Sequence, residues 1–274
     1  MARSYEKFFK INEVRETELA SLRNKLQFPV NAYVKENGFL AIVSYDYNKD
    51  DLFIASKSTN KGAYVDYIKE QLSQYYLKVL EYLKHYYENG IHRSLVFECI
   101  DIEHDPHIIK YNNSTIILLD IIENKITFNA TSYVMTVNEA SEFIGCPEKE
   151  RAFVLKDWDA FRDLYNQTQD EDYKYNGSYI EGFVFTDSTG FMTKCKTGYY
   201  NLWKQLRGVA EQTLRCGYIT RTGGLTTAVA NTFYGFLKTL YNQDYNKETK
   251  TYPYKTDIIS LRDKFIGNIL RVIE

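Results

Sequence analysis

Hydrophobic and polar positions alternate along residues 28–58 as in short antiparallel strands. Val30, Ala32 and Val34 point to one side of a strand that ends in the turn residues 36–38. An apolar run at residues 39–45 follows, and the polar turn at 48–51 leads into a third apolar run at 52–55. This pattern predicts a β-meander.

Along the rest of the chain, the spacing of apolar residues is that of a strand in some segments and that of a helix in others. Residues 62–89 carry apolar side chains at three- and four-residue steps and close on Asn89-Gly90, which predicts one long helix. The apolar runs at 95–102 and 115–122 predict strands, and the second is apolar enough to be buried on both faces. The remaining pattern predicts short helices within 138–165, a hairpin of residues 179–185 and 190–196, and helices from residue 203 with apolar stripes at 225–240 and 258–272.

Composition excludes some classes of function. The chain has 274 residues, of which 44% are hydrophobic and 26% charged, so a buried core is expected. The net charge of −2 gives no global positive field for nucleic acid. A polyanion would therefore be bound by a local cluster of Lys and Arg.

Cysteine spacing and hydropathy bear on the compartment. None of the four cysteines (Cys99, Cys146, Cys195 and Cys216) forms a C-x-x-C pair, so we expect reduced thiols. No run of 18 apolar residues is present, so no membrane span or membrane partner is expected. We expect a cytoplasmic protein, or a viral protein that acts in the host cytoplasm.

An ordered set of polar residues carries the candidate chemistry. Lys35 begins the string Lys-Glu-Asn-Gly, and Glu98, Glu181 and the pair Lys194 and Lys196 follow along the chain, each beside apolar strand residues. A lysine attacks phosphorus only as the free amine, and nearby cations and desolvation favour that form. Lys194 and Lys196 alternate on a predicted strand, so both point to one face, where they could also stabilise an α-phosphate.

Each of these residues also has an ordinary explanation. A lysine in Lys-Glu-Asn-Gly is most often a solvated residue of a hairpin turn, and single glutamates on strands are as often edge charges as ligands. Lys194 and Lys196 alone could be the exposed edge of a strand. The complete set in this order is much harder to obtain by chance, and it indicates attack on the α-phosphate of a nucleoside triphosphate.

Residues 2–203 resemble the phage-type RNA ligase 1 family and the ligase domain of fungal tRNA-splicing ligases, within the covalent nucleotidyltransferase superfamily. The most specific part is Glu-Lys-Phe-Phe at residues 6–9. The segments similar to the family's motifs are residues 2–13, 35–38, 55–58, 96–100, 116–119, 181–184 and 194–196. The resemblance implies an α+β fold with two mostly antiparallel sheets flanked by helices. It implies a nucleotidyltransferase domain at 1–203 and a small helical module at 204–274 that could set RNA specificity.

The resemblance also implies the site. Lys35 would carry AMP, Glu98 would contact the ribose, and Lys194 and Lys196 would act on the α-phosphate. Glu181, with Glu98, would hold Mg²⁺ or Mn²⁺. The remaining residues implied in ATP or phosphate binding are Lys7, Glu36, Gly38, Lys57 and Val184. An arginine-bearing strand that the family usually has upstream is not in the chain, so either Arg3 or another cation replaces it, or the chain is a domain of a longer protein.

The implied function is an ATP-dependent RNA ligase that seals 5′-phosphate and 3′-hydroxyl ends in RNA repair or tRNA splicing. Its partners would be RNA, including tRNA, and additional end-healing domains or subunits. Two alternatives from the same superfamily are a DNA ligase and a GTP-dependent capping enzyme. An alternative of another class is a non-catalytic RNA-binding scaffold with the same fold, against which the intact set of lysines and glutamates argues.

Overall fold

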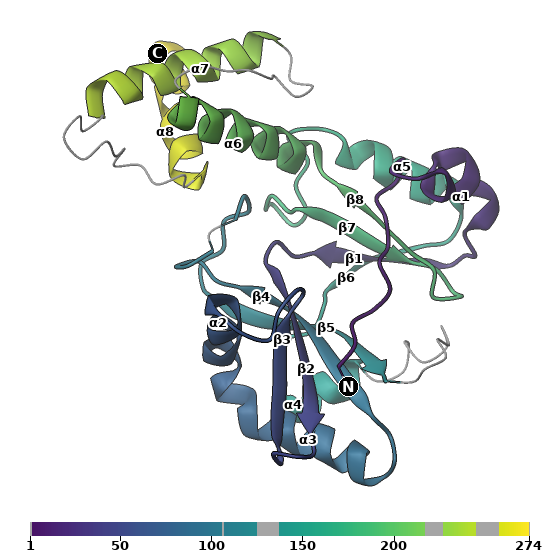
Figure 1. Ribbon diagram of the computed structural model, residues 1–274. Coiled ribbons are helices and arrows are strands. Elements are labelled where there is room, and N and C mark those ends of the chain that lie inside the picture. The colour runs from purple at the N-terminus through teal and green to yellow at the C-terminus, as the bar shows by residue number, and fades with distance from the viewer. Residues whose placement is uncertain (1, 106, 125–136, 217–226, 245–257, 274) are drawn as a thin grey trace. The chain divides into compact units, whose positions relative to one another are not determined.

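The computed structural model describes residues 2–105, 107–124, 137–216, 227–244 and 258–273 (Figure 1). The chain forms two compact units, each of which is assembled from separate segments. Unit 1 comprises Met1–Asp105, Tyr111–Gln167 and Gly182–Lys196. Unit 2 comprises Pro106–Lys110, Thr168–Glu181 and Thr197–Glu274. The predicted domain boundary at residue 203 stays a prediction, because a compact unit and a functional domain need not coincide.

Unit 1 contains two four-stranded antiparallel sheets. The first, called the β1 sheet, has the strand order β6 (Arg151–Leu155), β1 (Val30–Lys35), β7 (Gly182–Thr186) and β8 (Met192–Lys196). The second, called the β2 sheet, has the order β3 (Asp51–Ser56), β2 (Phe39–Asp46), β4 (Arg93–Ile100) and β5 (Thr115–Glu123). The two sheets and their flanking helices confirm the expected α+β class.

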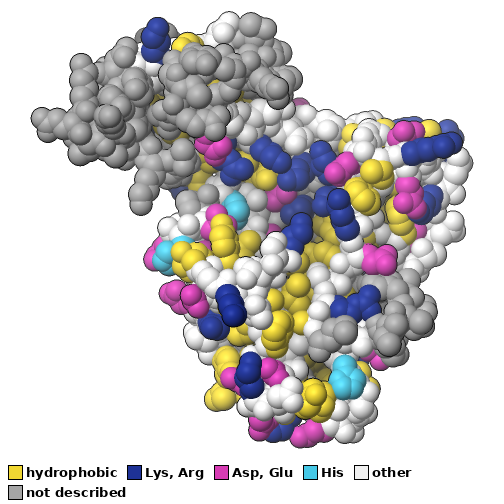
Figure 2. Space-filling view, viewed as in Figure 1, with side chains coloured by type: hydrophobic (Ala, Val, Ile, Leu, Met, Phe, Trp, Pro, Cys, Tyr) yellow, Lys and Arg dark blue, Asp and Glu magenta, His cyan; other side chains and the backbone are white. Residues whose placement is uncertain are grey.

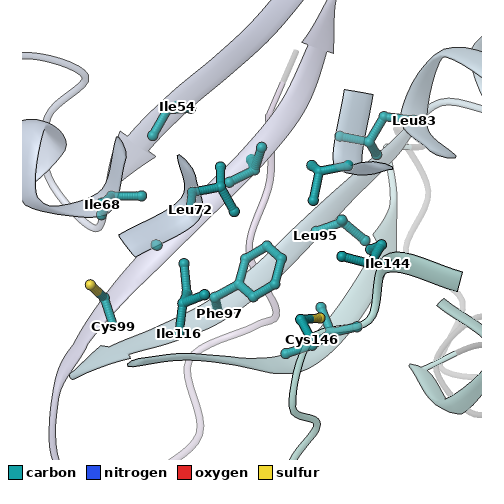
Figure 3. Close-up of a cluster of buried hydrophobic side chains, with 14 of the residues drawn as sticks. Ile54, Ile68, Leu72, Leu83, Leu95, Phe97, Cys99, Ile116, Ile144 and Cys146 are labelled. Atoms are coloured by element: carbon teal, nitrogen blue, oxygen red, sulfur yellow. The ribbon is translucent and has the colours of Figure 1, made fainter. Parts of the chain in front are cut away.

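Helices cover one face of each sheet, because one apolar face of a sheet must be buried. In Figure 1, α2 (Ala63–Leu72), α3 (Tyr76–Glu88) and α4 (Val137–Ile144) lie against the β2 sheet. The short helix α1 (Leu19–Lys25) and α5 (Trp158–Thr168) accompany the β1 sheet. The core under the β2 sheet joins helix residues such as Leu72 and Leu83 to strand residues such as Phe97 and Ile116 (Figure 3).

Several predicted elements differ in detail. The helix predicted at 62–89 is two helices, α2 and α3, separated by the 3₁₀ turn Ser73–Tyr75. Ser73 favours this break because its hydroxyl donates a hydrogen bond to the backbone oxygen of Glu70 at 2.7 Å. Strand β6, within 138–165, was not predicted. Its sequence, Arg-Ala-Phe-Val-Leu, does not alternate between polar and apolar residues.

Strand β5 is buried on both faces at Asp120, Ile121 and Ile122, but not along residues 115–119, where that prediction was wrong. Its residues alternate between half-buried and buried from Thr115 to Asp120. One reason is that the half-buried Leu119 lines a cavity, whereas Ile116 and Leu118 lie in the core on the other face. The hairpin of β7 and β8 was predicted, but β7 begins at Gly182, so Glu181 precedes the strand.

Unit 2 is built around α6 (Gly198–Cys216), α7 (Thr227–Asp244) and α8 (Ile258–Ile273). The two apolar stripes predicted α7 and α8, apart from residues 225–226, which lie outside the described residues, and α6 begins five residues before the helical pattern expected from residue 203. Phe233 packs edge-on against Phe265, with 5.0 Å between ring centroids, and Trp203 adjoins both rings. The buried Arg262 donates hydrogen bonds to the Tyr199 hydroxyl at 2.7 Å and to the Ile108 backbone oxygen at 3.2 Å.

Two further predictions concern the described residues. Cys99, Cys146 and Cys195 are buried and form no disulfide, in agreement with their spacing. Among the described helices, none combines the length and the apolar character that a membrane crossing requires.

Candidate active site

The turn after β1 holds Lys35 and is fixed by hydrogen bonds. Lys35 is half-buried at the last position of β1, and its Nζ donates to the backbone oxygen of Glu36 at 3.2 Å. The Tyr111 hydroxyl accepts from the Asn37 N–H at 2.7 Å and donates to Glu36 Oε2 at 2.8 Å. Tyr111 therefore positions both residues that follow the lysine, a role that the sequence did not reveal.

Gly38 allows this turn to lie directly against β4. A Cβ atom at residue 38 would stand 2.2 Å from the backbone oxygen of Cys99, which is far closer than any side chain tolerates. The Gly38 N–H donates to Glu98 Oε1 at 2.9 Å. The glycine of the Lys-Glu-Asn-Gly string thus connects the turn to Glu98, which is only 8% exposed in the middle of β4.

Strand register brings the three predicted catalytic lysines to one face of the β1 sheet. Lys35 pairs with Gly182, and Gly182 pairs with Lys196, so these residues form one row across β1, β7 and β8. The next row on the same face is Tyr33, Val184 and Lys194. Strands lie about 4.8 Å apart, which places the Cα atoms of Lys35 and Lys196 about 10 Å from each other.

Gly182 leaves the space between Lys35 and Lys196 free of a side chain. A Cβ atom at residue 182 would stand 2.0 Å from the backbone oxygen of Cys195, so the close pairing of β7 and β8 requires glycine. The row consequently carries a lysine on β1 and a lysine on β8, with no side chain on the strand between them. Such a space suits a phosphate that is contacted from two sides.

The N-terminal segment completes this edge of the sheet. The Lys194 N–H donates to the Phe9 backbone oxygen at 3.3 Å, and the Ile11 N–H donates to the Lys194 backbone oxygen at 2.9 Å. Lys194 Nζ lies 4.6 Å from the centre of the Phe8 ring. In Figure 2, Lys and Arg side chains gather over β7 and β8. A local cluster of this kind could bind a polyanion although the net charge of the chain is negative.

A cavity of about 60 Å³ in unit 1 lies between residues of the two sheets. Four predicted site residues line it, namely Lys35, Glu36, Glu98 and Val184. Nine further residues that were not predicted for the site also line it: Tyr5, Phe8, Tyr33, Val34, Leu119, Asp120, Lys149, Thr186 and Met192. The signal for Asp120 was present, since it is the one ionisable residue in the apolar run 115–122.

Asp120 is a cavity residue whose carboxyl has a raised pKa. It is 3% exposed, and burial raises the pKa of its carboxyl to about 6, while the Lys149 charge and the Ile121 N–H act in the opposite direction. Burial also raises the pKa of the Tyr5 hydroxyl, with further contributions from the negative charges of Glu98 and Asp120. The inner wall of the cavity is therefore a poor environment for additional negative charge.

The other predicted residues do not line the cavity. Lys7 is exposed, with its Nζ 4.6 Å from the centre of the Phe9 ring, and Lys57 is exposed after β3. Glu181 belongs to unit 2, is 3% exposed, and accepts a hydrogen bond at its backbone oxygen from the Thr197 N–H at 2.9 Å. The roles of these three residues stay predictions.

The donors fit a metal ion that is held mainly by phosphate and water. No group of three or more His, Cys, Asp or Glu within the described parts of the chain could hold a metal ion by itself. Mg²⁺ usually binds through one or two carboxylates, several waters and substrate phosphates. Glu98 can provide one carboxylate of that kind, and the metal role of Glu181, which belongs to unit 2, stays a prediction.

Comparisons with known proteins bear on the family and the fold. The model of a family described as RNA ligase matches residues 1–200. No curated protein matches the chain. Among solved structures, Naegleria gruberi RNA ligase with PPi is similar with a TM-score of 0.54 and 14% identity, over 72% of this chain and 57% of that chain.

Other structures of the Naegleria gruberi enzyme give similar values. A mutant with ATP and Mn has a TM-score of 0.53 and 13% identity, over 72% of this chain and 57% of that one. A mutant with AMP and Mn has a TM-score of 0.52 and 11% identity, over 72% and 56%. The chain therefore spans less than two thirds of these proteins, and at such identities the likeness shows the fold alone. The shared fold is that of the covalent nucleotidyltransferases.

Proposed function

The chain belongs to the RNA ligase family, and on this premise we propose that it is an ATP-dependent enzyme that seals RNA 5′-phosphate and 3′-hydroxyl ends. Lys35 Nζ attacks the α-phosphorus of ATP, so that a P–N bond forms, the P–O bond to pyrophosphate breaks, and the amine loses a proton. The AMP then moves to an RNA 5′-phosphate, which regenerates the lysine. A 3′-hydroxyl finally attacks the activated phosphate and releases AMP.

One observation carries the proposal. The register of β1, β7 and β8 sets Lys35 and Lys196 in one row with Gly182 between them, and Lys194 in the adjacent row on the same face. Negative charge grows on the α-phosphate oxygens as the lysine attacks, and fixed cations beside that charge lower the barrier. A scaffold without catalysis has no need for this arrangement.

The cavity provides a place for the nucleoside. Glu98 is held by the Gly38 N–H within reach of the cavity, where a carboxylate can accept hydrogen bonds from ribose hydroxyls. Leu119 and Val184 line the same cavity from different sheets and offer apolar surface to a base. When bound, a divalent cation would be held by Glu181 and Glu98 and would neutralise phosphate charge.

The biological setting is part of the proposal. We expect the substrate to be broken RNA, including tRNA, in the cytoplasm of a cell or of the host of a virus. Enzymes that prepare the RNA ends, as separate domains or subunits, would act before sealing.

Incubation with α-labelled ATP and Mg²⁺ or Mn²⁺ tests the first step. We expect the protein to gain one AMP, detected by intact mass, and peptide mapping should place it on Lys35. Lys35→Ala should abolish the label without loss of the fold, because this side chain is half-buried at a turn. Lys69→Ala is the matched control, since Lys69 is exposed on α2 and contacts only Asp66, at 3.7 Å, among the described ion pairs. Full labelling of Lys35→Ala would refute the proposed nucleophile.

A further inference from the structure

A β-bulge turns two neighbouring residues of β5 toward the cavity. Val96 pairs with Asp120 but Phe97 pairs with Leu118, so Leu119 is an extra residue opposite β4. Successive side chains of a strand normally point to opposite faces. Because of the bulge, Leu119 and Asp120 both line the cavity, whereas Leu118 and Ile121 lie in the core.

Asp120 also lies where the small cavity meets a larger one. The second cavity, of about 440 Å³, is on the same side of the β1 sheet in unit 1. The two cavities share the lining residues Tyr33, Asp120, Lys149, Thr186 and Met192. Backbone hydrogen bonds between Leu118 and residues 147 and 149, of 2.8 and 2.9 Å, hold Lys149 beside this boundary.

The rows of the β1 sheet give the direction of a bound nucleotide. The phosphate end is the row of Lys35, Gly182 and Lys196. The row that contains Thr186 and Met192 lies two rows further along, and successive rows are separated by about 7 Å. A nucleotide whose α-phosphate lies at the lysines and whose ribose lies at Glu98 therefore directs its base toward the shared boundary.

We propose that Asp120 selects adenine over guanine by accepting a hydrogen bond from the 6-amino group of the base. Adenine carries an amino donor at this ring position, whereas guanine carries an oxygen acceptor. A carboxylate that faces the 6-position attracts the first and repels the second. This inference rests on the proposed function, because it assumes that Lys35 takes up a nucleotide.

The surroundings of Asp120 suit an acceptor. Its Oδ1 accepts a hydrogen bond from the Ile121 N–H at 2.9 Å, and a carboxylate can accept several more. Lys149, whose Nζ lies 4.6 Å from the centre of the Tyr33 ring, favours the ionised form of Asp120 and lowers its pKa against the effect of burial. With that pKa at about 6, the carboxyl is mostly ionised above pH 7.

A simpler explanation is that Asp120 serves only as a structural partner of Lys149. The two explanations differ in one measurable quantity, the preference among nucleotides. A structural partner would affect ATP and GTP equally. A base-selecting residue would change the ratio of their rates.

The first experiment uses the unaltered protein and compares ATP, GTP and purine riboside triphosphate, which lacks the 6-amino group. The rate of covalent labelling is measured at subsaturating nucleotide. Purine riboside triphosphate should react roughly ten- to hundredfold more slowly than ATP, the effect of leaving one buried acceptor unpaired. GTP should be slower still. Equal rates for ATP and purine riboside triphosphate would overturn the proposal.

The second experiment compares Asp120→Asn with the matched control Glu148→Gln. An amide can turn either its oxygen or its amino group to the base, so Asp120→Asn should lower the ATP to GTP rate ratio by roughly tenfold or more. Glu148 lines the larger cavity without lining the smaller one, so its variant should keep the ratio of the unaltered protein. An unchanged ratio in Asp120→Asn would refute the role of Asp120.

Failure of this inference and failure of the proposed function give different results. No covalent label from any of the nucleotides would contradict the proposed function itself. Labelling with no dependence on the 6-position would contradict only the inference. If Asp120→Asn does not fold, the comparison of nucleotides with the unaltered protein still decides.

Discussion

Two single residues shape the surroundings of the cavity, and each is constrained by its position: Gly38 must lack a side chain, and Asp120 is a buried carboxyl. Gly38 cannot carry a side chain because β4 approaches its backbone, and the same approach lets its N–H bind Glu98. Asp120 keeps a carboxyl among apolar strand residues, where burial raises its pKa. Buried ionisable groups of this kind often mark functional sites.

Replacement of Asp120 by Asn should stabilise the protein, and more so at pH 8 than at pH 5. The folded-state pKa is raised from 3.8 to about 6, so the folded protein favours the neutral acid. That favourable contribution is complete below the unfolded pKa and is lost as the pH rises through about 6. The complete loss amounts to about 3 kcal/mol, of which about 1.4 kcal/mol falls between pH 5 and pH 8. Chemical denaturation at the two pH values measures it. Glu148→Gln serves as the half-exposed control, and an equal gain at both pH values would contradict the prediction.

Replacement of Lys194 or Lys196 by Ala should slow self-adenylylation strongly with little change in melting temperature. Each lysine would stabilise charge that grows in the transition state, and loss of one such contact typically costs roughly 10²–10³ in rate. Single-turnover labelling with ATP measures the effect. Lys78→Ala is a control from the exposed surface of α3, where the effect should be negligible. Rates near that of the unaltered protein would place the pair outside the reaction.

At the scale of elements, a β-bulge and the N-terminal segment, neither of which is regular secondary structure, form part of the cavity wall in unit 1. The bulge between β4 and β5 aims Leu119 and Asp120, and the segment around Phe8 follows the outer edge of β8. The Thr193 hydroxyl strengthens this second contact, since it is fully buried and donates to the Phe9 backbone oxygen at 2.9 Å. The N-terminal segment thus depends on β8 for its position.

Replacement of Thr193 by Val should loosen the N-terminal segment. The Phe9 oxygen loses one of its two donors, which should cost about 1 kcal/mol. Faster amide hydrogen exchange is expected at Ile11 and Lys194, together with slower labelling, because Phe8 lines the cavity. Thr193→Ser keeps the hydroxyl and should change both much less. Unaltered exchange at both amides in Thr193→Val would show that this hydrogen bond does not hold the segment.

At the scale of the whole molecule, the sequence indicated elements better than their junctions. Alternation at Val30, Ala32 and Val34 predicted strand β1, but the β-meander expected at 28–58 is divided between the two sheets, because β1 pairs with β6 and β7 and not with β2. The two sheets were expected from the family resemblance, and the alternation of Lys194 and Lys196 predicted that these two lysines share a face. The bulge at Leu119 could not be predicted, because it depends on pairing with β4 and leaves no mark in an apolar run. Tyr111 and Lys149 were missed for a similar reason, since long-range folding alone brings them to the turn and the cavity.

RNA ends should be sealed much faster than all-DNA ends of the same sequence. The expectation rests on membership of the RNA ligase family. Sealing of matched nicked or single-stranded substrates with ATP measures the preference. Strands that already carry 5′-adenylate, supplied without ATP, isolate the last step and show which step distinguishes the sugars. Equal rates on RNA and DNA would favour the DNA ligase alternative.

The contact between the N-terminal segment and β8 has a consequence for solubility. An outer strand exposes unpaired N–H and C=O groups that can pair with another chain and start aggregation. The Phe9 oxygen and the Ile11 N–H occupy these groups at Lys194. The N-terminal segment, which lines the cavity with Tyr5 and Phe8, therefore also covers part of the outer edge of β8. Any change that frees this segment would expose that strand edge to pairing with another chain and would leave the cavity incomplete.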